Sequence, residues 1–414
     1  GPDGKELIAA CPAAETFAFE ALPLRHNGIT RLSAQFLLLL RRPDGTLCKI
    51  ADRFGVQNAA SLIPNLYAFE VPSLVVDCAE FGARGNAVDD DTAAIQAAID
   101  SAAARGGGRV IVRGDDSFYG RRYLVTNLLL RSRIELVLEK GAVLWQSQDP
   151  ADYLYRPTYG HDGVIEGINW THCMHICNLP ILHAHNCECV KISGQGKIRS
   201  MDTGSEEGLD MPGYSCGCPD RIHQISIGFF NVRHVNLSNF EIVRANNYHM
   251  SLYHCAYVSV IGVKMHEVKC VSGDGIGLGK GSHHVLISNV LFQSNDDAVT
   301  MTASYHDPRG ILWWSSVHDG CCGSRDVRIE HSYLNSGGGK AVALLPWGTT
   351  QRYAEKAQMQ NIEVTDCHLS CVSPVGAWAD NPYAGRMPFD NAETDDWSPV
   401  MSVRIHDNLY QGNC

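Results

Sequence analysis

The sequence predicts an all-β fold: a right-handed parallel β-helix, or solenoid, with an N-terminal capping helix and a small N-terminal β domain. Two observations predict the solenoid. Short runs of alternating branched residues recur through the second half of the chain, and each run is followed by Asn, Asp, Ser or Gly. A second set of similar segments recurs in step with the first. Stacked repeats of this kind bury their inward residues against the next repeat.

Residues 1–74 predict the small N-terminal β domain. The stretches ETFAFEALPL and RLSAQFLLLLRR alternate apolar and polar residues, and RRPDGT is rich in turn formers. This pattern is typical of a small antiparallel sheet. The opening Gly1-Pro2 resembles a protease-cleavage scar, so the sequence leaves open whether a signal peptide once preceded it.

The segment 75–112 predicts the capping helix. Asp91 is expected to cap it, and Ala94, Ile95, Ala98 and Ile99 form an apolar stripe. Gly106, Gly107 and Gly108 follow and are expected to end the helix. We therefore expect residues 75–414 to form the solenoid, with this helix closing its N-terminal end.

The repeats that predict the solenoid align on one branched residue. They are VNLSNFEI from Val235, VSVIGVKM from Val258, VLISNVLF from Val285, VRIEHSYL from Val327, IEVTDCHL from Ile362 and VRIHDNLY from Val403. The steps between them are 23, 27, 42, 35 and 41 residues. A period in the low twenties with insertions in one loop is typical of stacked parallel strands.

A second column of segments predicts the candidate active site. These segments begin at Tyr248, Asp274, Asp297 and Lys340, and each ends in Leu or Met four residues later. If their apolar ends stack, their first residues also stack, with Asp296 beside Asp297, on an outer face. Crowded carboxylates repel, which raises at least one pKa and prepares an acid opposite a base for glycoside cleavage. The alternative is that these aspartates only form Asx turns.

Several further side chains are candidate substrate contacts. The insertion after Met301 carries aromatic and imidazole groups that suit a sugar ring, although the tryptophans could instead pack the loop. The predicted substrate-binding residues are Lys340, Tyr248, His249, His306, Trp313, Trp314, His318 and Trp347. Trp378, Asp380 and Asn381 in the C-terminal part are further hypotheses.

Composition and charge exclude several classes of protein. The chain is 45% hydrophobic and 19% charged, as expected for a folded protein with a large core. Its net charge is −11, so no broad basic field exists for a nucleic acid or an anionic membrane. The apolar run Phe36–Leu40 is too short to span a bilayer. The sequence leaves open whether the protein forms a homo-oligomer.

The cysteines and histidines do not predict a metal site. The 16 cysteines are spread along the chain and include the vicinal pair Cys321-Cys322, so we expect mostly free thiols, which favours a cytoplasmic location over secretion. The His and Cys residues between 172 and 189 lack a CxxC spacing and alternate as in a strand, so a metal is the weaker interpretation. No cofactor motif occurs: GDGIGLGKG is not followed by a helix pattern.

Residues from about Val75 to Met301 resemble the polygalacturonase-like family of right-handed parallel β-helices, glycoside hydrolase family 28. The segments that carry the resemblance include VKISGQGKI, SGDGIGL and SNDDAVTM. The resemblance implies an inverting hydrolase in which Asp274 matches the Asp of Asn-Thr-Asp, and Asp296 and Asp297 match the Asp pair one turn later. The family's Gly-His-Gly and Arg-Ile-Lys motifs do not occur as such, which makes a polyuronate a weaker expectation than a neutral glycan or short oligosaccharide.

Together these observations predict a glycoside hydrolase. Asp297 is expected to protonate the leaving oxygen, while Asp274 and Asp296 deprotonate the attacking water, although the roles can be exchanged. A polysaccharide lyase with Lys340 as base and a carboxylate-bound calcium ion is the first alternative. A fructosyl transferase or epimerase on the same fold is another. A non-catalytic carbohydrate-binding solenoid is the alternative from a different class.

Overall fold

The structure is a computed structural model of the chain. It describes residues 66–147, 149, 152, 179–200, 224–245, 248–267, 273–279, 281–302, 323–345, 359–377 and 400–412. For residues 7–56 and 164–176 only the strand bounds are described.

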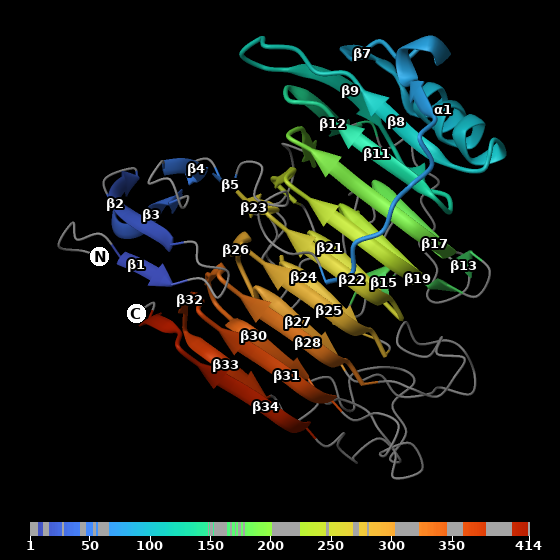
Figure 1. Cartoon of the computed structure of the whole chain (residues 1–414). Coiled ribbons are helices and arrows are strands. Elements are labelled where there is room, and N and C mark those ends of the chain that lie inside the picture. Colours follow the sequence, from blue (N-terminus) through green and yellow to red (C-terminus); the bar gives the residue numbers. More distant parts are fainter. Residues whose placement is uncertain are drawn as a thin grey trace, which may run out of the picture.

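The described chain winds into a solenoid whose successive coils each contribute strands to three faces (Figure 1). The predicted parallel β-helix is therefore confirmed. The first and second faces belong to one 16-stranded sheet, because the long strands β17 (Leu182–Gly194) and β19 (Ile227–Ser238) run through both. The third face is a 10-stranded sheet. The pairs in both sheets are parallel.

The remaining strands of the three faces are as follows. The first face adds β10 (Leu128–Leu129), β21 (Met250–Tyr253), β24 (Ile276–Gly279), β27 (Val299–Thr302), β30 (Lys340–Leu345) and β33 (Ser373–Ala377). The second face adds β6 (Val75–Asp77), β8 (Gly108–Val112), β11 (Ile134–Leu138), β22 (Ala256–Ile261), β25 (His283–Ser288), β28 (Arg325–Glu330), β31 (Met359–Thr365) and β34 (Val400–His406). The third face comprises β7 (Asn86–Asp90), β9 (Arg121–Val125), β12 (Ala142–Gln146), β18 (Lys197–Arg199), β20 (Glu241–Val243), β23 (Lys264–His266), β26 (Leu291–Ser294), β29 (Tyr333–Ser336), β32 (His368–Cys371) and β35 (Leu409–Gly412).

A separate antiparallel sheet forms near the N-terminus. Its strands follow in order and are β1 (Leu7–Ala10), β2 (Thr16–His26), β3 (Ile29–Arg41), β4 (Leu47–Asp52) and β5 (Gly55–Val56). This agrees with the small β unit that the alternating stretches predict. Two short antiparallel pairs complete the strands: β13 (Val164–Ile165) with β14 (Ile168–Asn169), and β15 (Thr171–His172) with β16 (His175–Ile176).

The strand register confirms the repeats that the sequence predicts. On the second face, Val235 pairs with Val258, Val258 with Val285, and Val285 with Val327. The column continues through Ile362 to Val403. Each branched residue thus lies directly above the corresponding residue of the previous coil, and its side chain enters the same core layer.

A left-handed backbone position recurs at the corner between the second and third faces. Its members all have positive φ and are Asn239, Gly262, Asn289, His331, Asp366 and Asp407. Gly, Asn and Asp adopt this conformation at the lowest cost, which explains why the runs meet these residues at that point. Within this column, His331 is the one residue that is not Gly, Asn or Asp.

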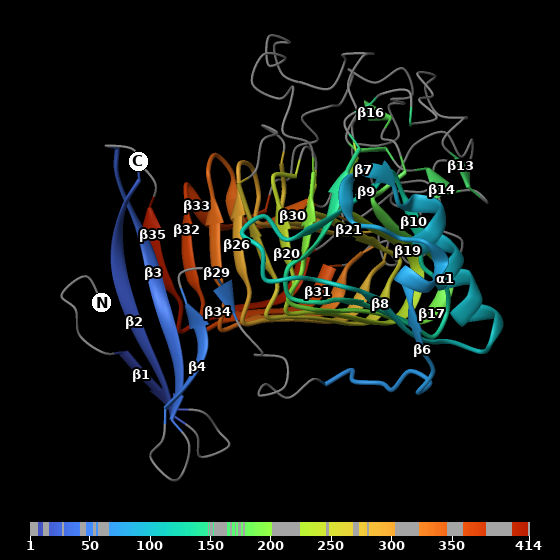
Figure 2. The same cartoon turned by 90° about the horizontal axis from the view of Figure 1, so that it is seen from above.

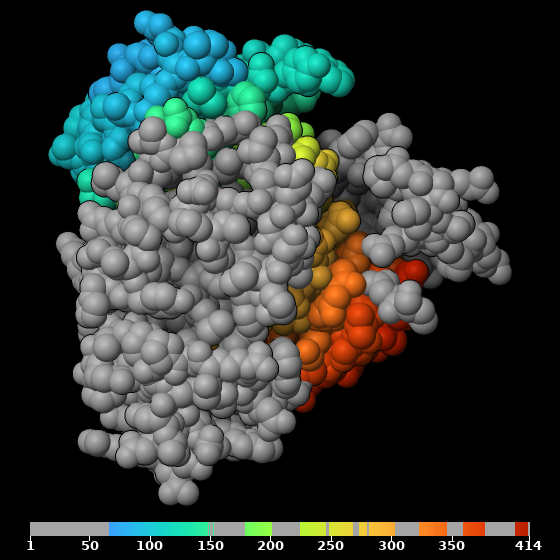
Figure 3. Space-filling view, turned by 180° about the vertical axis from the view of Figure 1, so that it is seen from behind, coloured from blue at the N-terminus to red at the C-terminus, as the bar shows by residue number. Residues whose placement is uncertain are grey.

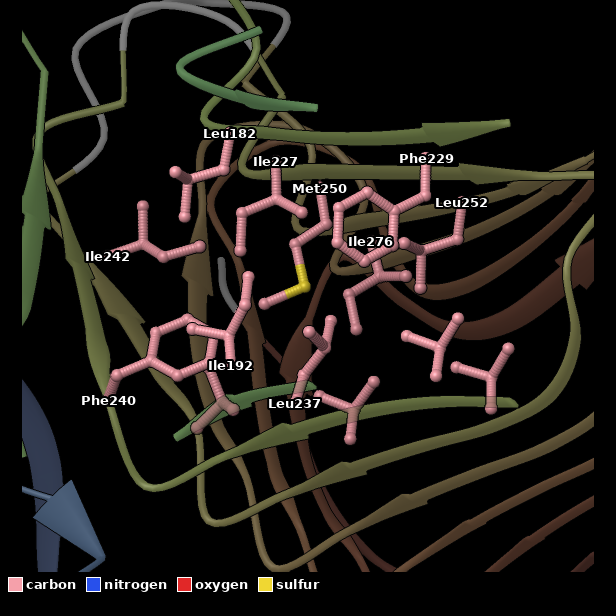
Figure 4. Packing of buried hydrophobic residues seen from close by; sticks show 14 of the residues in the cluster. Leu182, Ile192, Ile227, Phe229, Leu237, Phe240, Ile242, Met250, Leu252 and Ile276 are labelled. Atoms are coloured by element: carbon pink, nitrogen blue, oxygen red, sulfur yellow. The ribbon is translucent and has the colours of Figure 1, made fainter. Parts of the chain in front are cut away.

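The core fills the space enclosed by the three faces. Figure 4 shows Leu237, Met250 and Ile276 pointing inward from three strands, with Phe240 from the corner after β19. These side chains are almost completely removed from solvent. Figures 2 and 3 show the coils following one another from blue to red along the molecule. Each coil therefore buries its apolar residues against the coils on either side.

The helix α1 (Thr92–Ala104) closes the N-terminal end, with the short 3₁₀ helix Cys78–Phe81 beside it. Ile95, Ala98 and Ile99 are buried as the stripe predicts, whereas Ala94 is only partly buried. Asp91 is the N-cap residue of α1, as predicted, but its side chain makes no capping hydrogen bond to the helix. The Asp91 carboxylate accepts the N–H groups of Arg84 and Gly85 at 2.6 and 2.9 Å, so it fixes the preceding loop instead of the first turn.

Residues 66–74 cross the outside of the second face (Figure 1). The ring of Tyr67 lies 6.0 Å from the ring of Tyr257 and 6.4 Å from that of His284. The ring of Phe69 lies 6.3 Å from that of His234. This segment is thus held to the solenoid by aromatic contacts. Within the described chain, no helix has the length and apolar character needed to cross a membrane.

Candidate active site

The candidate site lies at the start of four successive strands of the first face, β21, β24, β27 and β30. The N–H of His249 donates to the carbonyl of Asp274, that of Gly275 to Asp297, and that of Ala298 to Lys340, at 2.9 to 3.0 Å. These bonds place Tyr248, Asp274, Asp297 and Lys340 in one column, as the second set of repeats predicts. Asp296 precedes Asp297 in the turn after β26.

Side chains of this column lie outside the core. Ala298 and Val299 belong to the core cluster, so their side chains point inward. The neighbouring Asp297 and Thr300 point to the opposite side, because Thr300 reaches the Asp274 carboxylate. Thr300 is in register with Gly277 and Ala343. The outer side of the first face therefore presents small residues beside a row of carboxylates.

Asp274 is the most enclosed of the three carboxylates, at 3% exposure. Its Oδ2 accepts the hydroxyl of Thr300 at 2.6 Å, and its Oδ1 accepts the N–H of Asp297 at 3.3 Å. A further hydrogen bond comes from the side chain of Tyr248. Thr300 is a functional candidate that the sequence interpretation missed. Its one signal is its place three residues after Asp297, on the outward side of the strand.

The pair Asp296 and Asp297 faces the strand that follows. The N–H of Lys340 donates to Asp297 Oδ1 at 2.6 Å. The Asp296 carboxylate accepts no hydrogen bond within the described residues, and it is the most solvent-accessible of the three. The stem of Lys340 lies over Gly376, where a Cβ would meet its Cδ and Cε at 2.8 Å. Lys340 thus lies beside the pair on the C-terminal side.

Burial raises the pKa of all three carboxyl groups. Burial is the largest cause at Asp274, and the charges of Asp296 and Asp297 raise its pKa further. Burial and the charge of Asp297 raise the pKa of Asp296 to about 6, against the lowering effect of Lys340. Burial also raises the pKa of Asp297, although the Lys340 N–H and ammonium oppose this. Three crowded carboxyl groups thus retain protons at a pH where an isolated aspartate is ionised.

An aromatic cluster borders the site on its N-terminal side. It comprises Phe230, Tyr248 and Tyr253 with Ile225 and Leu179. Gly277 and Gly279 lie beneath the two tyrosine rings, because a Cβ at either position would come within 3.1 to 3.4 Å of ring atoms. The two glycines therefore let the rings lie close to the surface of β24.

His249 is placed differently from the other predicted substrate contacts. Its side chain is fully buried, and Nδ1 lies 2.9 Å from the carbonyl oxygen of Asp274. Burial lowers the pKa of this imidazole to about 4, so it is neutral near pH 7. Its Nε2 has no hydrogen-bond partner among the described residues. The imidazole supports the backbone of Asp274 from the interior side.

The other predicted substrate contacts lie outside the described residues. They are His306, Trp313, Trp314, His318 and Trp347, together with Trp378, Asp380 and Asn381. These residues stay predictions. Of the predicted group, the described part of the chain brings together Tyr248, Lys340 and the three aspartates.

The described cysteines are free thiols: Cys78, Cys187, Cys189, Cys255, Cys367 and Cys371. Cys187 packs against the core, as the alternation predicts. Cys189 has a left-handed backbone and lies partly buried. Within the described ranges, no cluster of three or more His, Cys, Asp or Glu side chains is suited to hold a metal ion.

Comparisons with known proteins agree on the fold. The chain matches no family model and no curated protein. Among solved structures it is similar to a family 28 exopolygalacturonase from Yersinia enterocolitica, with 16% identity, a TM-score of 0.56, and coverage of 92% of this chain and 66% of that one. It is also similar to a hyperthermoactive exopolygalacturonase from Thermotoga maritima, with 17% identity, a TM-score of 0.55, and coverage of 82% and 76%.

A third similar structure comes from a phage. It is a tailspike protein mutant of Escherichia coli bacteriophage HK620 in complex with a pentasaccharide, with 11% identity and a TM-score of 0.51. The alignment covers 90% of this chain and 54% of that one. The chain thus spans about two thirds of the Yersinia protein and about half of the tailspike. At these identities the comparisons establish the parallel β-helix fold.

Proposed function

We propose that this protein is a carbohydrate-active enzyme, a glycoside hydrolase that acts at Asp274, Asp296 and Asp297. The observation that carries the proposal is the convergence of three carboxyl groups with raised pKa on the outer side of one face. Glycoside cleavage needs one protonated and one ionised carboxyl group at the scissile bond. A purely structural Asx ladder needs no such crowding, because each Asx turn is satisfied within its own coil.

Hydrogen bonding favours Asp296 as the proton donor. Asp274 and Asp297 accept backbone and hydroxyl donors, which favour their ionised forms and oppose the rise in pKa that burial causes. Asp296 accepts none within the described chain and is more accessible, so it is best suited to retain a proton and reach a leaving oxygen. We therefore reverse the sequence-based roles: Asp296 protonates, and Asp274 with Asp297 activates water.

A neutral sugar is the proposed substrate class. The described groups that surround the carboxylates are the hydroxyls of Thr300 and Tyr248 and the single cation Lys340. Hydroxyl groups bind sugar hydroxyls, whereas each uronate carboxylate needs a cation of its own. Lys340 already offsets the charge of the aspartate pair. A chain of uronates would add further negative charge to a protein of net charge −11.

The proposal is tested by incubating the protein with neutral and acidic glycans and examining the products. New reducing ends on a neutral glycan, with inverted configuration by proton NMR, are expected. Asp296→Asn should lower kcat by about 10³-fold or more while the folded state persists, because the proton donor is lost. The exposed Asp116→Asn, at 95% side-chain exposure, is the matched control. Full turnover by Asp296→Asn would refute the role of Asp296.

A polysaccharide lyase is the second candidate, because Lys340 lies in the same column as Asp274 and Asp297. A lyase would release unsaturated ends from an acidic glycan, and Lys340→Met would abolish the reaction. Saturated products that persist in a chelator would exclude a calcium-dependent lyase reaction.

A further inference from the structure

We propose that Gly339 is the positioning residue of the acid pair: its missing side chain provides the space in which the carboxyl groups of Asp296 and Asp297 converge. This inference rests on the proposed function of the pair. Gly339 immediately precedes β30 and faces both aspartates of the previous coil.

A side chain at position 339 would lie too close to the two carboxyl groups. A Cβ at this position would lie 2.4 Å from Asp297 Oδ1 and 2.6 Å from Asp296 Oδ1. Real Cβ atoms essentially never approach an oxygen so closely, so a methyl group would displace both carboxyl groups. Both oxygens thus lie within 2.6 Å of one point. The glycine therefore sets how near the two acids come to each other.

The backbone at Gly339 is fixed and cannot retreat from a larger side chain. Its N–H donates to Ser336 Oγ at 2.8 Å. The next N–H, from Lys340, donates to Asp297 Oδ1 at 2.6 Å. The carbonyl of Lys340 accepts the N–H of Ala298 at 2.9 Å. The first bond fixes the turn within its own coil, and the other two hold the segment against the coil that carries the pair, so the carboxyl groups must move instead.

The neighbouring Gly338 provides a matched control. A Cβ there would meet only the carbonyl oxygen of Asn295, at 3.3 Å. Neither glycine has the positive φ that penalises alanine. The variants Gly339→Ala and Gly338→Ala therefore add the same methyl group to adjacent residues and differ only in what it contacts.

Moving the carboxyl groups should affect chemistry more than binding. A misplacement of about 1 Å at a catalytic group costs about 100-fold in rate. We expect Gly339→Ala to lower kcat by about that factor with KM changed less than about 3-fold. Separation of the pair also weakens the repulsion that holds a proton on Asp296, so the basic limb of the kcat profile should move to lower pH. Gly338→Ala should leave kcat, KM and the pH profile unchanged.

An unfolding cycle tests the same contact without any substrate. Gly339→Ala is compared with wild type, and again in a background that carries Asp296→Ala and Asp297→Ala. If the methyl group meets the carboxyl groups, its lowering of the unfolding midpoint should become smaller in that background, where only the 2.9 Å approach to the backbone carbon of Asp296 remains. A midpoint lowered equally in both backgrounds, or a wild-type kcat and pH profile for Gly339→Ala, would overturn the inference.

The two proposals fail in different ways. If no glycan is cleaved, or Asp296→Asn retains full turnover, the proposed function fails while the unfolding cycle still reports on Gly339. If Asp296→Asn is inactive but Gly339→Ala turns over normally, the inference about Gly339 fails alone.

Discussion

At the scale of single residues, the site depends on how each carboxyl group is held. Asp274 accepts three donors, and the bond from the Thr300 hydroxyl measures 2.6 Å. A hydrogen bond to the ionised carboxylate lowers its pKa, and here it opposes the raising effect of burial. Thr300 therefore decides at which pH Asp274 becomes available as a base.

Thr300→Val keeps the shape of the side chain but removes the donor, so the pKa of Asp274 should rise. The acidic limb of the activity profile should then move to higher pH, and kcat measured below neutrality should fall about 10-fold. The measurement is a pH profile of kcat from about pH 4 to 9.

Thr302→Val on the same strand is the control. Its hydroxyl also lies on the outward side of β27 but has no hydrogen-bond partner within the part of the chain that the structure describes. Its removal should leave the acidic limb in place. Equal shifts for Thr300→Val and Thr302→Val would contradict a specific role for Thr300.

At the scale of the strand and the turn, the left-handed corner explains the spacing of the repeats. The column from Asn239 to Asp407 turns the chain from the second face to the third in every coil. At Asn289 the side-chain amide nitrogen is buried and has no hydrogen-bond partner in the described ranges. The contribution of this asparagine is therefore its backbone conformation, and a side-chain ladder contributes little there.

Substitutions of Asn289 separate these two contributions. Asn289→Ala should lower the free energy of unfolding by about 1 kcal/mol, because alanine adopts positive φ at a cost. Asn289→Gly should be close to neutral, because glycine adopts it freely. Urea unfolding monitored by circular dichroism measures both. Equal destabilisation by the two variants would show that the side chain matters instead.

The periodic pattern of the sequence predicts the strands and their stacking. Contacts between segments that are distant in the sequence could not be predicted in this way. The column from Val235 to Val403 follows from alternation and turn residues, which act locally. The column from Tyr248 to Lys340 follows from the same stacking. The bond that Asp91 makes to the preceding loop and the burial of His249 depend on neighbouring segments, so local pattern did not reveal them. The contact of Gly339 with the acid pair likewise arises only when two coils meet.

At the scale of the whole molecule, the three carboxyl groups of Asp274, Asp296 and Asp297 lower the free energy of unfolding. The solenoid buries apolar side chains along its length, but at the first face it also encloses carboxyl groups that lose their hydration. Sites that carry out chemistry are commonly less stable than their surroundings. The enclosure that raises the pKa of Asp296 therefore has a measurable cost for folding.

This cost should appear as a pH-dependent gain in stability for Asp296→Asn. The pKa of Asp296 is about 6 in the folded protein, above that of an unfolded aspartate near 4. Below about pH 4 the carboxyl group is protonated in both states, so variant and wild type should differ little. As the pH rises to about 6, the unfolded chain releases its proton first, and wild type loses stability that the amide does not. Above this range the variant should be more stable by about 1 to 3 kcal/mol. Urea unfolding at a series of pH values, with Asp116→Asn as the exposed control, measures the difference. A gain that is independent of pH, or absent at neutral pH, would contradict a raised pKa at Asp296.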